Sequence, residues 1–457
     1  MRCLWWLAIL ASFPAFAQSN WVDAGMPFNS VGVSQLYADP AQNRLLAIGP
    51  ITLSMDLAFP VIAAYGTSGW SAISGIEYGG IYTAIRIGDT LLVGGYFHQI
   101  DGIPIDLVGA WYDSEWHAFG AFPTDDGVVR KLRVVDGSLY AIGSFLTVDG
   151  HTCHGVAKRV GGHWENIGSI DYPAGDEPIV LDVCEYLGNI VVGGELNPIG
   201  LGNDLIQFDG TNWVNVGDGL LDGVGAVTCL AVYQDELYVG GGLYAGAGSP
   251  AHGLVRWNGS EWRDVGGSMR DIYGTTQYNA SASSMLVHYG KLLVGGAFGY
   301  AGTLHANQFA IWDGQTWCAT GDSIGGTVES MALYHDTLFI ACTNTLNGQP
   351  ANYIGRWVGG AFEQNCEQVG MEEPATTLSG GITIGPDEGG QRALFGLPDG
   401  RYAVALFDAT GRLLTTEAVT STGGHARMDA RTAASGLYLV RVTSGEYLGT
   451  ARFINAQ

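Results

Sequence analysis

The apolar residues of this chain fall into short runs that are separated by turn-forming residues. In one stretch, Val227–Val232 is followed by Leu237–Val239, the glycine pair at 240–241 and Leu254–Trp257. Runs of roughly four to eight such residues, bounded by Gly, Asp and Asn, predict β-strands rather than helices. The pattern therefore predicts an all-β protein built from many short strands.

A tryptophan recurs within this pattern at a nearly constant interval. Successive copies are 49, 46, 48, 49, 49 and 55 residues apart, and Phe362 follows the last copy by 45 residues. This interval is the length of one four-stranded blade of a β-propeller. The repeated residues are Trp21, Trp70, Trp116, Trp164, Trp213, Trp262 and Trp317.

Each repeat has the same internal order. The second strand ends near a glycine pair, as at Gly295-Gly296, and the third ends in an aromatic residue followed by a turn such as Asp313-Gly314. Asp-Gly and Asn-Gly turns supply the positive φ of a tight hairpin, and paired glycines remove side chains where blades crowd together. The aromatic residue and the repeat Trp then fill the space between blades.

The copy at Trp21 precedes seven complete repeats. A lone strand around Trp21–Gly25 can pair with the last blade and join the two ends of a ring. We therefore predict a seven-bladed β-propeller closed by this strand, over residues 18–366. The alternative has eight blades, with the strand at Phe362 building part of an incomplete last one.

These residues carry a resemblance to the kelch-like, galactose-oxidase-type propeller repeat, over about residues 21–366. The turn here is a shorter Asp/Asn-Gly form, and three repeats lack the glycine pair. The repeat is more similar to Gly-rich propeller repeats of exported bacterial proteins, of the form LLVGGxFxxAG…AxWDGxxW. The resemblance implies a fold; no copper-binding Tyr and His set aligns with this chain.

The first residues have the order of a secretory signal peptide. Arg2 is followed by an apolar run at Leu4–Ala11 and by Ala15-Phe16-Ala17, which predicts cleavage after Ala17. A membrane anchor is the alternative, but the run is too short to span a bilayer. The mature protein is expected to have no membrane span.

The repeat pattern is lost after Cys366, where residues 367–380 read as a linker, and short strands then return over 381–457. Leu406–Leu413 and Ala434–Val442 resemble the type IX secretion sorting domain of exported Bacteroidetes proteins, a small β-sandwich. Ile384–Asp387 and Arg452 stand where that family usually has Pro-Asn-Pro and Lys. The resemblance implies recognition by the type IX secretion machinery and a secreted or cell-surface location. The alternative is an accessory sandwich with a ligand of its own.

Charge narrows the range of partners. The chain has 20 Lys and Arg against 44 Asp and Glu, a formal net charge of −24, so a nucleic acid or an anionic membrane surface would be repelled. Acidic residues and tyrosines gather in the loops between successive repeats, where a propeller presents one face. The candidate ligand-face residues are Asp125, Asp126, Asp176, Asp222, Asp271 and Tyr273.

These loops carry two interpretations. Converging carboxylates could bind Ca²⁺ or hydrogen-bond sugar hydroxyls, whereas Asp is also a common residue of solvated turns. No segment has EF-hand spacing, so a calcium site would have to be assembled between blades. No metal or other cofactor is predicted. His151–His154 forms the densest group of soft ligands, and it is interpreted as surface histidines rather than as a transition-metal site.

Six cysteines remain after Cys3 leaves with the signal peptide, and their spacing matches no zinc motif. Cys184 and Cys229 are interpreted as buried thiols, with a disulfide as the alternative. Cys318 and Cys366 are candidates for a disulfide across the closing blade.

No GxSxG elbow, P-loop or dinucleotide fingerprint occurs, and no catalytic residue is predicted. We therefore expect an exported binding scaffold for a glycan or a protein partner. The alternative is an extracellular carbohydrate-active enzyme that uses paired loop carboxylates as acid and base.

Overall fold

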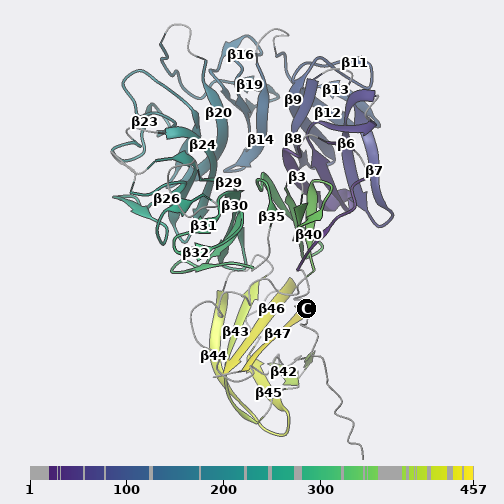
Figure 1. Ribbon diagram of the computed structural model, residues 1–457, viewed down its shortest axis with the longest axis vertical. Coiled ribbons are helices and arrows are strands. Elements are labelled where there is room, and N and C mark those ends of the chain that lie inside the picture. Colours follow the sequence, from purple (N-terminus) through teal and green to yellow (C-terminus); the bar gives the residue numbers. More distant parts are fainter. Residues whose placement is uncertain are drawn as a thin grey trace, which may run out of the picture.

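The structure is a computed structural model in which β-strands are joined by turns and loops (Figure 1). It describes residues 20–27, 29–30, 32–54, 57–76, 79–122, 127–173, 177–220, 224–244, 250–271, 280–320, 324–342, 345–346, 348–358, 383–386, 391–395, 397, 399–408, 413–429, 436–444 and 447–455. The signal peptide at 1–17, the linker at 367–380, Phe362 and Cys366 lie outside the described residues. No helix among the described residues is long and apolar enough to cross a membrane.

The described residues up to 358 form seven antiparallel groups of strands, one for each predicted repeat. The first group contains β3 (Gln35–Asp39), β4 (Arg44–Ile48), β6 (Leu57–Gly66) and β7 (Gly69–Gly75); β5 (Ile51–Ser54) also pairs with β6, and β2 (Asn29–Ser30) pairs with β5. The second contains β8 (Gly79–Ile87), β9 (Thr90–Phe97), β12 (Val108–Tyr112) and β13 (Glu115–Ala118). The third contains β14 (Val129–Val135), β15 (Ser138–Gly143), β18 (Val156–Val160) and β19 (His163–Glu165).

The remaining groups follow in the same order. The fourth contains β20 (Ile179–Tyr186), β21 (Asn189–Glu195), β22 (Leu205–Phe208) and β23 (Trp213–Asn215), and the fifth contains β24 (Val224–Tyr233), β25 (Glu236–Leu243), β26 (Leu254–Trp257) and β27 (Trp262–Asp264). The sixth contains β29 (Ser281–His288), β30 (Lys291–Ala297), β33 (Phe309–Trp312) and β34 (Trp317–Cys318). The seventh contains β36 (Ser330–Tyr334), β37 (Thr337–Ala341), β40 (Ile354–Trp357) and β1 (Trp21–Asp23).

Short two-residue strands lie in the loops. They are β10 (Gln99–Ile100), β11 (Ile103–Pro104), β16 (Thr147–Val148), β17 (His151–Thr152), β28 (Met269–Arg270), β31 (Tyr300–Ala301), β32 (Leu304–His305), β35 (Ile324–Gly325), β38 (Thr345–Leu346) and β39 (Gln349–Pro350). A 3₁₀ turn, η1 (Pro40–Gln42), joins β3 to β4.

The pairing of β1 joins the two ends of the repeat region. Trp21 lies opposite Trp357 on β40, so a strand from the start of the chain completes the last sheet, as predicted. The Trp21 ring is 2% exposed and makes edge-to-face contacts with Phe309 and Trp357, at centroid distances of 5.6 and 5.1 Å. The last sheet is therefore built from both ends of this region.

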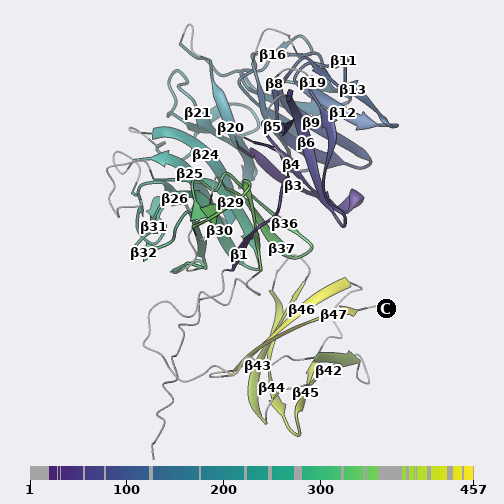
Figure 2. The ribbon, with the colours of Figure 1, turned by 45° about the vertical axis from the view of Figure 1, so that its right-hand side comes forward.

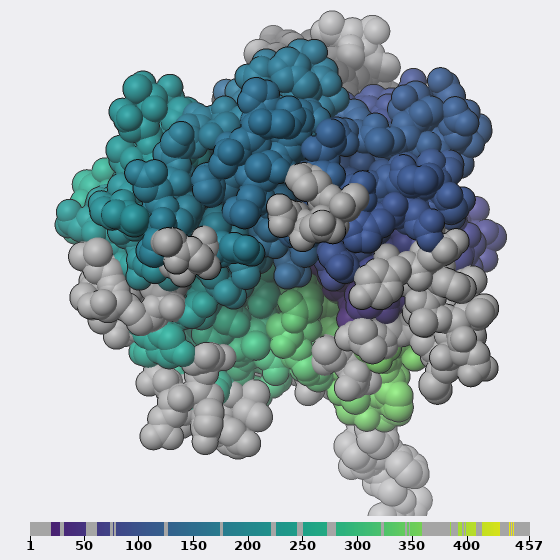
Figure 3. Space-filling model, turned by 90° about the horizontal axis from the view of Figure 1, so that it is seen from above, coloured from purple at the N-terminus to yellow at the C-terminus, as the bar shows by residue number. Residues whose placement is uncertain are grey.

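The first strand of each sheet contacts the first strand of the next. The order of contact is β3, β8, β14, β20, β24, β29 and β36, and β36 contacts β3 again. In Figure 3 the colours run around the view from blue through teal to green, and the green last sheet lies beside the purple first one. Neighbouring sheets thus follow the chain in order and the last lies against the first.

Each glycine of the pair allows a different part of the protein to lie close to the second strand. A Cβ on Gly94 would lie 2.7 Å from Val129 of the next sheet, whereas a Cβ on Gly95 would meet the backbone of Gly80 in its own sheet. The first glycine therefore admits the neighbouring sheet, and the second admits a bulged first strand.

The repeat Trp links neighbouring sheets by hydrogen bonds as well as by packing. The indole Nε1–H donates to a backbone carbonyl about one repeat earlier: Trp70 to Ala24, Trp164 to Phe119, Trp213 to Gly168 and Trp317 to Val265, at 2.6 to 3.0 Å. At these four positions the Trp side chain therefore joins its own sheet to the preceding part of the chain.

Two further sheets lie in the C-terminal part, shown in yellow-green in Figure 2. One contains β41 (Thr383–Pro386), β42 (Gln391–Phe395) and β45 (His425–Asp429), and the other contains β44 (Leu413–Ser421), β43 (Gly400–Asp408), β46 (Gly436–Ser444) and β47 (Tyr447–Asn455). Leu394 and Met428 from the first sheet and Val404 and Val440 from the second are buried in one hydrophobic cluster. This is the arrangement expected of a small β-sandwich.

Asp204, in the loop before β22, is expected to make the stability of the protein depend on pH. Burial raises its pKa to about 6 from 3.8, and its carboxylate accepts a hydrogen bond from Leu196 N–H at 2.9 Å. Because the unfolded chain loses this proton at lower pH than the folded protein, stability falls as the pH rises from about 4 to about 6. We expect Asp204→Asn to abolish that fall and to be more stable at pH 7.5 by about 1 to 3 kcal/mol, in urea unfolding measured across pH.

The chain contains a natural precedent for this replacement. In the sixth repeat, the neutral side-chain amide oxygen of Gln308 accepts the equivalent bond from Phe298 N–H at 2.8 Å. Asp209→Asn is the control. Backbone hydrogen bonds from Asn212 and Thr211 lower the pKa of that exposed carboxylate, so its replacement should lower stability at neutral pH, whereas Asp204→Asn should raise it. Equal pH profiles for the wild type and Asp204→Asn would show that Asp204 is not buried in its charged form.

Candidate functional site

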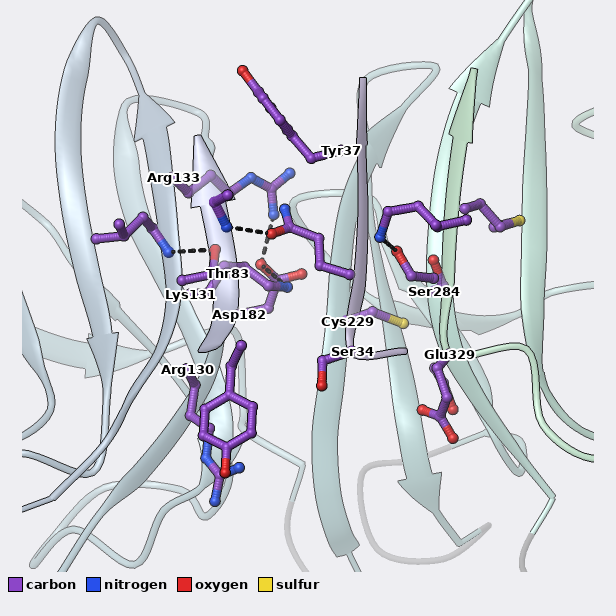
Figure 4. A pocket seen from close by; sticks show the side chains of 18 of the residues that line it. Ser34, Tyr37, Thr83, Arg130, Lys131, Arg133, Asp182, Cys229, Ser284 and Glu329 are labelled. Carbon is purple, nitrogen blue, oxygen red and sulfur yellow. Dashed lines mark hydrogen bonds and ion pairs between the residues drawn. The ribbon is translucent and has the colours of Figure 1, made fainter. Parts of the chain in front are cut away.

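A cavity of about 290 Å³ lies where the first strands of the seven sheets converge (Figure 4). One residue from each first strand lines it at the same position of the repeat, opposite the first residue of the glycine pair or its substitute. These seven residues are Gln35, Thr83, Lys131, Asp182, Cys229, Ser284 and Ser330. The same position of every repeat therefore contributes to one cavity.

These side chains also tie neighbouring sheets together. Four of them accept a hydrogen bond from a backbone N–H of the following sheet: Gln35 from Ala84, Thr83 from Leu132, Asp182 from Leu230 and Ser330 from Leu36, at 2.7 to 3.1 Å. The donor is in each case the residue after the equivalent position. Satisfying these buried backbone groups gives the polar position a structural role beside any role in binding.

Strand β14 brings three basic side chains to the cavity. Arg130, Lys131 and Arg133 all line it, and a bulge between Val129 and Lys131 changes the alternation of the strand. The whole chain has 20 Lys and Arg in 457 residues. Three of them in four consecutive positions give this wall a positive charge that is unusual for an acidic protein.

Asp182, on β20, is saturated with hydrogen bonds. Its Oδ1 accepts from Arg133 Nη1 at 2.6 Å and Val183 N at 2.8 Å and lies 3.0 Å from Lys131 Nζ, and its Oδ2 accepts from Leu230 N at 2.9 Å. Burial opposes its ionisation, but the charges of Lys131 and Arg133 and the bond from Leu230 outweigh burial and hold its pKa below the ordinary value. Asp182 is thus a fixed carboxylate that orients two cations.

Arg130 and Glu329 lie toward one end of the cavity, whereas Tyr37 and Arg133 lie toward the other (Figure 4). The Arg130 guanidinium lies over the Tyr82 ring, 5.2 Å from its centroid. Among the described residues, neither the Arg130 guanidinium nor the Glu329 carboxylate has an ion-pair or hydrogen-bond partner. Glu329 is open to the water of the cavity, but the surrounding protein raises its pKa by desolvation.

The predicted ligand-face residues lie mostly outside the described part of the chain. Asp125, Asp126, Asp176, Asp222 and Tyr273 are not among the described residues. Asp271 is described and is 7% exposed, so its side chain is packed within the protein rather than presented on the surface. The loop face remains a prediction.

The histidine and cysteine group does not form a cluster of ligands. Cys153 is 2% exposed, with its thiol 3.6 Å from the His151 carbonyl oxygen, and the His154 ring lies against Tyr172. Nowhere in the described ranges do three or more His, Cys, Asp or Glu side chains gather as a metal site would require.

The described cysteines are of two kinds. Cys184 and Cys229 are buried free thiols, which confirms the preferred interpretation, and burial raises the pKa of each to about 12. Cys153 and Cys342 are also free. Cys318 is disulfide-bonded, and Cys366, its predicted partner, lies outside the described residues.

The cavity residues were not predicted from the sequence. A signal was present, because Val129–Val135 holds three basic residues within four positions in a chain poor in basic residues. Which end of the strand faces the centre, and which residues of the other six strands meet it there, depend on contacts between different repeats.

Comparison with known proteins identifies the C-terminal part. Residues 395–455 match the family described as the secretion system C-terminal sorting domain. This match confirms the predicted type IX sorting domain, and the chain is a protein exported through that system to the cell surface or the surroundings. No kelch or other propeller family matches the chain. No curated protein matches it either.

Removal of the sorting domain is expected to block export. A chain that ends at residue 380 keeps all described strands of the seven sheets but lacks the matched segment. We expect it to accumulate in the periplasm of a type IX-secreting host, while the full chain reaches the cell surface or the medium. Immunoblots of cell fractions measure this. Surface display of the shortened chain at the level of the full chain would contradict the prediction.

Proposed function

We propose that the seven sheets are the blades of a β-propeller closed by β1, and that the exported protein binds a saccharide ligand in its central cavity. The closed order of contacts among the first strands and the pairing of Trp21 with Trp357 support the propeller. A single polypeptide then surrounds the cavity on all sides, which is the usual way in which this architecture forms a binding site.

The observation that carries the binding role is a pair of charged groups without internal partners at one end of the cavity. Most buried or half-buried charges in proteins are paired within the fold, as Lys131 and Arg133 are with Asp182. Arg130 and Glu329 are exposed, line the cavity and have no such partner in the described part of the chain, so their charged groups are available to a ligand. Serine hydroxyls of Ser34 and Ser283 line the same cavity. Such a set of polar groups suits a ligand rich in hydroxyls.

The cavity supports binding rather than glycoside hydrolysis. Hydrolysis of the usual kind needs two carboxyl groups flanking the scissile bond. The described carboxylates of the cavity are Asp182 and Glu329, and all four contacts of Asp182 are already made within the protein. Glu329 alone does not make an acid and base pair.

A glycan array and a reducing-sugar release assay test the proposal together. We expect the mature protein to retain specific glycans on the array and to release no reducing ends from them. Ser283→Trp, which fills the cavity, should abolish retention, and Val358→Trp, at a position that is 48% exposed outside the cavity, should not. Thermal unfolding verifies that both variants are folded. Absence of binding to any glycan would refute the proposed function, and release of reducing ends would favour an enzyme.

A further inference from the structure

The cavity carries an excess of positive charge inside a strongly acidic protein. Among its described lining residues, the charged side chains are those of Arg130, Lys131 and Arg133 against Asp182 and Glu329. With every group ionised the net charge is three minus two, or +1, and it is larger whenever Glu329 is protonated. Charges that line a concave, protein-walled site act on a ligand more strongly than the same charges on an open surface. The cavity therefore favours an anion, although the chain as a whole has a net charge of −24.

Arg130 is the cation available to that anion. Lys131 and Arg133 are 3.0 and 2.6 Å from the Asp182 carboxylate and are held by it, whereas Arg130 rests only on the Tyr82 ring. Stacking on an aromatic face fixes the plane of a guanidinium and leaves its N–H edge free to donate. A guanidinium edge binds a carboxylate by two parallel hydrogen bonds.

Other polar side chains that line the cavity suit hydroxyl groups. Glu329 accepts hydrogen bonds from hydroxyls, and Ser34 and Ser283 both donate and accept them. A volume of about 290 Å³ is at the small end of ligand sites, so it admits a small molecule or one terminal unit of a longer chain.

We infer that the cavity binds the acidic sugar unit of a uronate-containing saccharide, with its carboxylate on Arg130 and its hydroxyls on Glu329, Ser34 and Ser283. This inference rests on the proposed function and specifies its ligand class. It assigns discrimination between acidic and neutral sugars to a single side chain. It assigns to Asp182 the positioning of Lys131 and Arg133, which maintain the positive potential of the wall.

Calorimetric titration of the full mature protein with two matched disaccharides tests the inference. Digalacturonate is the acidic probe, and the corresponding neutral digalactose is its control. We expect tighter binding of the acidic probe and a loss of that preference as NaCl rises. Arg130→Gln should weaken binding of digalacturonate about 10- to 100-fold, the usual range for a lost charge-assisted pair, and leave binding of digalactose unchanged.

Arg356→Gln is the matched control variant. It removes the same charge from an exposed position on β40 that does not line the cavity, so both affinities should be those of the wild type. Arg130 is itself exposed toward the cavity, so its replacement should leave thermal unfolding unchanged.

The results separate the two proposals. Equal affinity for both disaccharides, with no effect of Arg130→Gln, would overturn the inference and leave glycan binding in place. Binding of glycine or glutamate in preference to either disaccharide would overturn it as well, because the cavity would then recognise a zwitterion. If neither disaccharide binds but the array retains other glycans, the uronate inference alone is rejected. If neither the titration nor the array shows binding, the proposed function is rejected as well.

Discussion

Replacing Trp21 by alanine is expected to lower the free energy of unfolding by about 3 to 5 kcal/mol, the usual cost of emptying the site of a buried aromatic ring. The Trp21 side chain is 2% exposed and lies between Phe309 and Trp357. Its strand completes the seventh sheet, so the loss of packing falls where the two ends of the repeat region join. Urea unfolding followed by tryptophan fluorescence measures the change.

Trp111→Ala is the matched control, because Trp111 lies on the third strand of its sheet with 36% of its surface exposed. We expect it to cost about 1 kcal/mol, the typical effect of a point mutation. If Trp21→Ala proves too unstable to purify, the milder Trp21→Phe should fold with an intermediate loss. Equal losses for Trp21→Ala and Trp111→Ala would contradict a special role for the N-terminal strand.

The second large effect is expected at Asp182. Asp182→Ala should destabilise the protein by about 3 kcal/mol, because it leaves Lys131 and Arg133 without a counter-charge and Leu230 N–H without an acceptor. This loss is at the lower end of the range usual for breaking a buried ion pair, because both cations can turn toward the water of the cavity. Urea unfolding at pH 7 measures the loss.

The pH dependence of this effect has a definite sign. The pKa of Asp182 is lowered in the folded protein, so its stabilising contribution is present above the unfolded-state value of 3.8 and is lost as the pH falls through the lower folded-state value. The difference between the wild type and Asp182→Ala should therefore shrink in strong acid. Asp182→Asn, which keeps an acceptor oxygen for Leu230 N–H, should cost less than Asp182→Ala. A difference between wild type and Asp182→Ala that grows on acidification would contradict this ion-pair account.

Much of the fold was predictable because each repeat encodes its own sheet. The Gly pairs, the Asp/Asn-Gly turns and the aromatic pairs act over a few residues, so each repeat specifies strands and hairpins locally. Gly210, Gly259 and Gly314 of the predicted turns do have positive φ, at 94°, 95° and 102°. The strand at Trp21 was also predictable, because seven complete repeats follow it and leave it without a partner in its own neighbourhood.

The residues of the candidate site were harder to predict from the sequence than the fold. Asp and Tyr are conspicuous in the loops between repeats, so the sequence favoured these loops as the ligand face, but Asp271, a described member of that set, is buried. The cavity residues Gln35, Thr83, Lys131 and Asp182 have little in common as residue types. They share only a position in the repeat, which becomes visible when the bulge and the register of each first strand are known.

By itself, the sequence determined an all-β chain of repeats, an N-terminal strand that pairs with the last repeat, and a C-terminal domain for type IX secretion. These follow from turn chemistry, apolar periodicity and a family pattern, all of which are local along the chain. The tertiary structure decided that Asp182 neutralises Lys131 and Arg133, and that Arg130 and Glu329 face one cavity without partners in the described chain. Those relations join residues that are about one repeat or more apart in the chain, and the charge of a site depends on which groups meet across such distances.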